Sequence, residues 1–137
     1  KSVLYFLPTG FAVVMLGANL NCEENIRKIR EKLSDYFEII DESSILTTKP
    51  VGKKYKTDFV NQAIKIITDE SAKSVVKTFK SIENQMGRSA FTNLRGEVPA
   101  DIDLVFWNGE KKRNDYDKYW FVQQLCDEIK DRSEFIN

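Results

Sequence analysis

Two aspartates separated by a single residue, Asp101 and Asp103, begin an apolar run. Side chains alternate between the faces of a strand, so both carboxylates are predicted on one face, and the core receives Ile102, Leu104 and Phe106. Two ionised carboxylates about 5 Å apart repel by about 3 kcal/mol at an effective dielectric constant near 20. A cation would relieve this repulsion, and oxygen ligands without His or Cys favour Mg²⁺. Asp101 and Asp103 are therefore the predicted metal ligands, and the alternative is a solvated strand end.

Other residues in the chain have types that suit a ligand site. Phe59 and Asn61 share one face of a predicted strand, where a ring and a carboxamide can stack on and hydrogen-bond a flat heterocycle. The alternative is an ordinary core aromatic. Glu83 lies near the end of a predicted helix, shortly before Arg88, and an isolated helical glutamate is usually a solvated charge.

The composition limits the classes of function. The 137 residues fit one domain (1–137), and 42% hydrophobic with 31% charged residues is typical of a globular protein. Lys plus Arg and Asp plus Glu both number 21, so the net charge predicts neither a nucleic acid nor a membrane partner. The absence of histidine excludes His metal sites and Ser-His or Cys-His nucleophile pairs.

The cysteines and the N-terminal residues bear on location. Cys22 and Cys126 have no ligand-like spacing, which excludes a structural zinc site and favours reduced thiols in the cytoplasm. The uncharged stretch 2–22 can be an export signal or the start of a buried strand. Pro8 and Gly10 divide it into pieces too short to span a bilayer, which favours the strand. Residues 1–10 remain a possible N-terminal extension.

The pattern of apolar residues predicts the elements that position these side chains. They are a strand at 11–16, a helix capped by Asn21 with a capping box to Glu24, extended segments at 37–41, 45–48 and 58–68, a helix at 71–86, a loop at 89–99, a strand at 101–107 with a turn at 108–109, and a helix at 118–130. This order predicts an α+β fold, a ferredoxin-like α/β sandwich in which helices pack on a largely antiparallel sheet.

Several fragments, taken in order, resemble one family from about Phe11 to Lys130. The fragments are Gly17-Ala18-Asn19-Leu20, Thr48-Lys49-Pro50-Val51-Gly52, Asp58-Phe59-Val60-Asn61, Glu83-Asn84-Gln85-Met86-Gly87-Arg88, Asp101-Ile102-Asp103-Leu104, and Phe121 with Glu128-Ile129. Each is short, but together they are similar to the 6-hydroxymethyl-7,8-dihydropterin pyrophosphokinases of folate biosynthesis. The resemblance implies Mg²⁺-dependent transfer of pyrophosphate from ATP to the pterin hydroxymethyl group.

The resemblance also implies roles for individual residues. Asp101 and Asp103 would hold two Mg²⁺ ions that bridge the ATP phosphates to the pterin hydroxyl, and Arg88 would be a third catalytic residue. The implied pterin-binding residues are Phe59 and Phe121, which would sandwich the ring, Asn61, which would read its amide edge, and Thr48 and Val51, which would line the pocket. The implied nucleotide-binding residues are Glu83, Arg88, Arg95 and Leu104.

The chain departs from the family on the nucleotide side. Ala90 and Val98 stand where the family usually has arginines, and Arg95 stands where it has a loop tryptophan. The segment before the last helix is shorter than usual and lacks a histidine, and its basic run 111–113 could substitute only as mobile point charges. A pterin-binding relative without catalysis and a ferredoxin-like interaction domain are therefore the alternatives to a pyrophosphokinase. The oligomeric state is left open.

Overall fold

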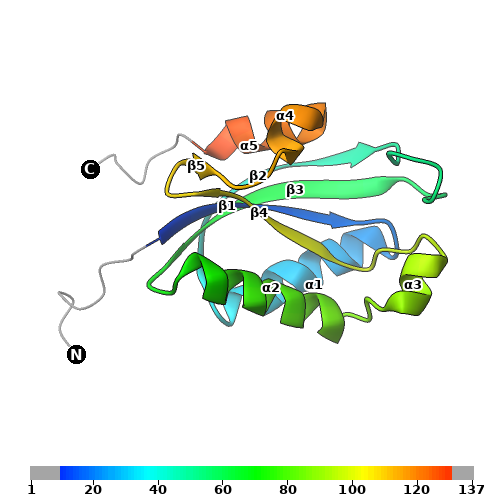
Figure 1. Ribbon diagram of the computed structural model, residues 1–137, viewed down its shortest axis with the longest axis horizontal. Coiled ribbons are helices and arrows are strands. Elements are labelled where there is room, and N and C mark those ends of the chain that lie inside the picture. Colours follow the sequence, from blue (N-terminus) through cyan, green and yellow to red (C-terminus); the bar gives the residue numbers. More distant parts are fainter. Residues whose placement is uncertain (1–9, 131–137) are drawn as a thin grey trace.

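The computed structural model describes residues 10–130 (Figure 1). Apart from Gly10, the possible N-terminal extension at 1–10 lies outside the described residues. The elements are β1 (Gly10–Ala18), α1 (Cys22–Ser34), β2 (Glu38–Thr48), β3 (Phe59–Thr68), α2 (Ala72–Gln85), α3 (Ala90–Leu94), β4 (Asp101–Trp107), β5 (Glu110–Lys111), α4 (Asp115–Lys118) and α5 (Trp120–Ile129). Among the described residues, no helix is long and apolar enough to cross a membrane.

The strands of residues 10–130 form one antiparallel sheet in the order β2-β3-β1-β4-β5. Helices α1 and α2 lie on one face of this sheet, and α4 and α5 lie on the other (Figure 1). The succession β1-α1-β2-β3-α2-β4 is the ferredoxin-like motif. The predicted α+β class with helices on an antiparallel sheet is therefore confirmed.

Two hydrophobic cores hold the layers together, one on each face of the sheet. The first takes the apolar faces of α1 and α2, and its buried helix residues are Ile26, Ile29, Leu33, Val75, Phe79 and Ile82. The second takes Val122, Leu125 and Ile129 of α5. The central strand β1 contributes to both cores, which explains why its sequence is apolar without alternation.

A β-bulge changes the predicted faces of β4. The register between β1 and β4 shifts between Val13 and Val14, so that Phe106 lies opposite Val13. Ile102 and Leu104 are in the first core as predicted, but Phe106 packs in the second core, so its predicted face is wrong. The extra residue of a bulge reverses the alternation beyond it. Asp101 and Asp103 precede the bulge and keep the face that alternation gives them.

Several local details differ from the sequence-based expectations. Asn21 precedes α1, but its φ of 44° is left-handed and its side chain makes no cap hydrogen bond, so the capping box with Glu24 is wrong. The expected loop at 89–99 contains α3, which Ser89 caps through a capping box with Thr92. The last helix starts at Trp120, because the chain between Lys118 and Trp120 is extended at Tyr119.

Candidate active site

The acidic pair lies at the start of β4, beside the end of β1. Asp101 is opposite Gly17 and Asp103 is opposite Met15 in the antiparallel register. The Asp101 side chain is 37% exposed, and that of Asp103 only 18%. A Cβ on Gly17 would lie 3.6 Å from Asn61 Oδ1 and 3.9 Å from Asp101 Cβ. Because Gly17 has no side chain, the space beside Asn61 and Asp101 is left unfilled.

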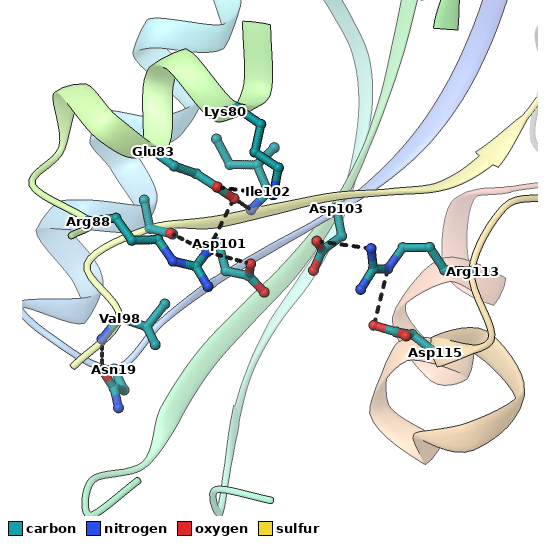
Figure 2. A network of polar contacts seen from close by, with 11 residues as sticks. Asn19, Lys80, Glu83, Arg88, Val98, Asp101, Ile102, Asp103, Arg113 and Asp115 are labelled. Carbon is teal, nitrogen blue, oxygen red and sulfur yellow. Dashed lines mark hydrogen bonds and ion pairs between the residues drawn. The ribbon is translucent and has the colours of Figure 1, made fainter. Parts of the chain in front are cut away.

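Arg88, which follows α2, binds the carboxylate of Asp101. Its Nη1 donates to Asp101 Oδ1 at 2.8 Å and to the Ala100 carbonyl at 3.2 Å (Figure 2). Gly87, with φ of 96°, ends α2 and turns the chain so that Arg88 follows beside β4. Burial works against the charge of Arg88, but the hydrogen bond and the charge of Asp101 outweigh it and raise the pKa of the guanidinium.

Glu83 is buried and joins α2 to β4. It is 3% exposed, and its Oε2 accepts a hydrogen bond from the Ile102 N–H at 2.8 Å. Arg88 Nη1 lies 3.3 Å from the same oxygen (Figure 2). Burial raises the pKa of this carboxyl, against the opposing effects of the Ile102 N–H and Arg88. The expectation that a helical glutamate is solvated is wrong here, because Glu83 follows Phe79 by one helical turn on the buried face.

Replacing Glu83 by alanine should lower the free energy of unfolding by about 1–3 kcal/mol, because the buried Ile102 N–H would lose its acceptor. Glu83→Gln keeps an acceptor oxygen and should cost less. Urea unfolding of both variants measures the difference, with Glu31→Ala on exposed helix surface as the matched control. Equal costs for Glu83→Ala and Glu83→Gln would contradict the role of the hydrogen bond.

The second carboxylate has a basic neighbour on the opposite side. Arg113 Nη1 lies 3.6 Å from Asp103 Oδ1, and Arg113 Nε donates to Asp115 Oδ2 at 3.3 Å (Figure 2). Burial is the main cause that raises the pKa of Asp103 to about 8, followed by the charge of Asp101 and a hydrogen bond with it. Without a cation, burial and the neighbouring carboxylate therefore favour the protonated form of Asp103.

Asp103→Asn should stabilise the cation-free protein at alkaline pH. The folded-state pKa of about 8 lies above the ordinary value of 3.8, so the carboxyl's contribution to stability is complete at low pH and is lost as the pH rises through about 8. The amide does not ionise. We expect the free energy of unfolding to rise by about 1 kcal/mol or more near pH 9, the worth of one pKa unit, with little change near pH 4. Thermal melting in a chelator tests this, and an equal shift at both pH values would contradict it.

One cavity of about 310 Å³ adjoins the acidic pair. All five residues that the sequence assigns to pterin line it, together with Arg88, Asp101 and Asp103; the five are Thr48, Val51, Phe59, Asn61 and Phe121. Asn61 Nδ2 donates to Thr48 Oγ1 at 2.9 Å and to the Leu46 carbonyl at 3.1 Å. These bonds fix the amide of Asn61, with its nitrogen turned toward β2.

The sequence reasoning missed two aromatic residues of this cavity, Tyr55 and Tyr119. Tyr55 meets Phe59 edge to face with ring centroids 5.2 Å apart, and Tyr119 stacks on Phe121 at 5.7 Å. Tyrosines in a polar loop and between two helices carry no periodic signal, so only tertiary structure brings them here. Four aromatic rings therefore line a slot beside the carboxylates.

A second, more open groove of about 390 Å³ lies between α2 and β4. Its lining includes three lysines, Lys73, Lys80 and Lys112, and the predicted nucleotide residue Leu104. Asp103 and Arg113 line both this groove and the aromatic cavity. Of the other predicted nucleotide residues, Glu83 and Arg95 line neither, and Arg95 pairs with Glu97 at 2.9 Å. The aromatic cavity and the basic groove therefore meet at Asp103, and Asp101 lies on the side of the aromatic cavity.

The donor set of the acidic pair fits Mg²⁺. Among residues 10–130, no three His, Cys, Asp or Glu side chains are grouped so that they could hold a metal ion. A cation here would thus have Asp101 and Asp103 as its protein ligands and would complete its coordination with water or substrate oxygens. Mg²⁺ is bound in this way, because it dehydrates reluctantly and usually takes one or two carboxylates together with phosphate oxygens.

Comparison with known proteins agrees with the resemblance drawn from the motifs. The sequence model of the family described as 7,8-dihydro-6-hydroxymethylpterin-pyrophosphokinase matches residues 13–131. The 2-amino-4-hydroxy-6-hydroxymethyldihydropteridine pyrophosphokinase of Haemophilus influenzae is 29% identical over 107 residues, which are 76% of this chain and 66% of that protein. Its Bacillus subtilis counterpart is 29% identical over 102 residues, 72% of this chain and 60% of that protein.

A plant protein also matches most of the chain. The folate synthesis bifunctional protein of Arabidopsis thaliana is 29% identical over 101 residues, 72% of this chain and 21% of its own length. The chain thus spans 66% or less of the length of these three relatives.

Proposed function

Because the chain belongs to the 7,8-dihydro-6-hydroxymethylpterin-pyrophosphokinase family, we propose that it transfers pyrophosphate from ATP to 6-hydroxymethyl-7,8-dihydropterin, a step of folate biosynthesis. One observation on this chain supports the proposal. Asp101 and Asp103 both line the aromatic cavity and Asp103 also lines the basic groove, so that a flat heterocycle and a polyphosphate can be brought together over one cation site.

The aromatic cavity would hold the pterin. Phe59 and Phe121 would stack on the faces of the ring, and Asn61 would accept a hydrogen bond from its amide edge through Oδ1, since Nδ2 already donates to Thr48 and Leu46. Thr48, at the end of β2, and Val51, in the loop between β2 and β3, would close the rim. The hydroxymethyl group would then point toward Asp101 and Asp103.

The basic groove would hold ATP. Lys73, Lys80 and Lys112 supply positive charge along it, and Arg113, which lines both cavities, supplies a guanidinium. Leu104 lies in its floor, where it can pack against the base. Arg88 would contact the phosphates from the Asp101 side, and Glu83 would act indirectly, through its bond to the Ile102 N–H beside both aspartates. Arg95 is on the loop at 89–99 and would have to turn away from Glu97 to reach the nucleotide.

The transfer needs positioning and charge neutralisation more than a strong base. The pterin hydroxyl oxygen forms a bond to the β-phosphorus of ATP, the bond from that phosphorus to the α,β-bridging oxygen breaks, and AMP leaves with the bridging oxygen. The hydroxyl proton is lost to solvent. Asp101 and Asp103 would hold the Mg²⁺ ions, two by the family resemblance. These ions would neutralise the charge of the ATP phosphates beside the pterin hydroxyl.

Calorimetry with a non-hydrolysable ATP analogue, Mg²⁺ and the pterin tests this proposal against its alternatives. The pyrophosphokinase binds both ligands, a relative without catalysis binds the pterin alone, and an interaction domain binds neither. Binding of the pterin alone, or of neither ligand, would overturn the proposal.

We expect nucleotide binding to be much weaker than pterin binding and to weaken steeply with salt. Arginines are missing at positions 90 and 98, and the lysines of the groove are exposed, for example Lys80 with a side chain 68% accessible. Exposed charges are screened within about 10 Å at 0.1 M salt, whereas stacking on Phe59 and Phe121 is not. Lys80→Ala should weaken binding of the ATP analogue several-fold. Lys77→Ala, on the same helix but outside the groove, should leave this binding unchanged. Tight binding of the analogue that resists salt would contradict the assignment.

A further inference from the structure

Arg113 lies between two carboxylates that come from different elements. Asp103 belongs to β4, and Asp115 is the first residue of α4. Figure 2 shows the guanidinium between them, and Arg113 lines both cavities. The two contacts are unequal. Nε donates a hydrogen bond to Asp115 Oδ2 at 3.3 Å, whereas Nη1 is 3.6 Å from Asp103 Oδ1, beyond hydrogen-bonding distance.

The other carboxylate of the pair is held quite differently. Arg88 Nη1 is 2.8 Å from Asp101, in a direct hydrogen bond. If Arg113 bound Asp103 equally closely, an arriving cation would have to break ion pairs on both aspartates. The hydrogen bond from Nε to Asp115 instead holds the guanidinium on the α4 side of the site. Its terminal nitrogens then keep only the longer ion pair with Asp103 at 3.6 Å and can turn toward phosphate oxygens.

We propose that Asp115 is a positioning residue, which holds Arg113 beside Asp103 so that the acidic pair stays open to a divalent cation and Arg113 faces the polyphosphate. This inference rests on the proposed function for the identity of the anion. Asp115 acts through Arg113 and not as a third ligand, since the described residues hold no group of three carboxylates placed around one metal ion.

The proposal predicts what happens when Asp115 is removed. Arg113 loses its tether and moves onto Asp103, the nearest remaining carboxylate. The cation then competes with a closer ion pair, and the guanidinium is turned away from the phosphates. We expect Asp115→Ala to weaken divalent cation binding and ATP analogue binding by about tenfold each, the size of one charge-assisted contact.

A double-mutant cycle with Arg113 separates this mechanism from simple attraction between Asp115 and the cation. The variants are Asp115→Ala, Arg113→Ala and the double variant, with Asp117→Ala as the matched control. Asp117 is in the same short helix, pairs with Lys111 and lines neither cavity. Binding of Mn²⁺ alone, followed by the loss of its free-ion electron paramagnetic resonance signal, is read without pterin or nucleotide.

Asp115→Ala should weaken Mn²⁺ binding about tenfold in the natural chain and less than about twofold in the Arg113→Ala background. Asp117→Ala should leave it unchanged. Asp115→Asn, which keeps an acceptor for Nε, should recover part of the affinity and serves in place of the alanine variant if that does not fold. An equal loss in both backgrounds would overturn the positioning role. Because Mn²⁺ binding needs no turnover, a chain that binds Mn²⁺ as expected but transfers no pyrophosphate would refute the proposed function and leave the role of Asp115 in cation binding intact.

Discussion

Asp103→Ala is expected to lower the rate of pyrophosphate transfer by at least about a thousandfold while the protein stays folded. The carboxylate is one of the two protein ligands that the acidic pair offers a cation. Stabilisation of transition-state charge by bound metal is worth several kcal/mol, and each 1.36 kcal/mol is about tenfold in rate. The fold should hold because burial and then the charge of Asp101 make the ionised carboxylate unfavourable at this position and raise the pKa of Asp103, so its removal takes away an unfavourable group.

The rate of AMP formation at saturating ATP, pterin and Mg²⁺ measures this loss, and circular dichroism checks the fold. Asp117→Ala is again the control, since it also removes an aspartate but lines neither cavity. If the Asp103→Ala variant turns over as fast as the natural chain, the cation site lies elsewhere.

Phe121→Ala should weaken pterin binding by about 1–3 kcal/mol, or about fivefold to 150-fold, through the loss of stacking and buried area. Its ring lines the cavity and stacks on Tyr119 with an interplanar angle of 27°, so the truncation removes one wall of the slot. Asn61→Ala should cost a comparable amount, because a polar group of the bound pterin would then be buried without a partner.

Calorimetric titration with the pterin measures both variants. Phe91→Ala is the matched control, since Phe91 is 71% exposed on α3 and lines no part of the cavity. Unchanged pterin affinity in both Phe121→Ala and Asn61→Ala would mean that the ring binds at another place on the molecule.

The parts of the fold that follow from period and alternation could be predicted from the sequence. The strand at 101–107 lies where it was expected, and the amphipathic helices are as expected because each presents a single apolar stripe to one core. The bulge in the β1–β4 pairing could not be predicted, since a one-residue register shift depends on the partner strand. The face of Phe106 depends on that shift, whereas the faces of Asp101 and Asp103 do not.

The site was predictable where one element sets the geometry. The shared face of Asp101 and Asp103 is a property of a single strand. The burial of Glu83 had a signal in the sequence, its place one turn after Phe79, but charge alone argued against it. The tether of Arg113 to Asp115 lies in a segment without periodicity, where the sequence showed only mobile charge. Tyr55 and Tyr119 are brought to the cavity by loops, and loop paths depend on tertiary contacts.

The most direct test of the central claim is to identify the products that the chain forms from ATP, Mg²⁺ and 6-hydroxymethyl-7,8-dihydropterin. Phosphorus NMR and chromatography follow the nucleotide and the pterin together. Transfer of pyrophosphate at the junction of the two cavities predicts AMP and pterin diphosphate in equal amounts, with neither formed when Mg²⁺ or the pterin is omitted. Formation of ADP with a pterin monophosphate, or ATP and pterin left unchanged in Mg²⁺ although both bind, would contradict it.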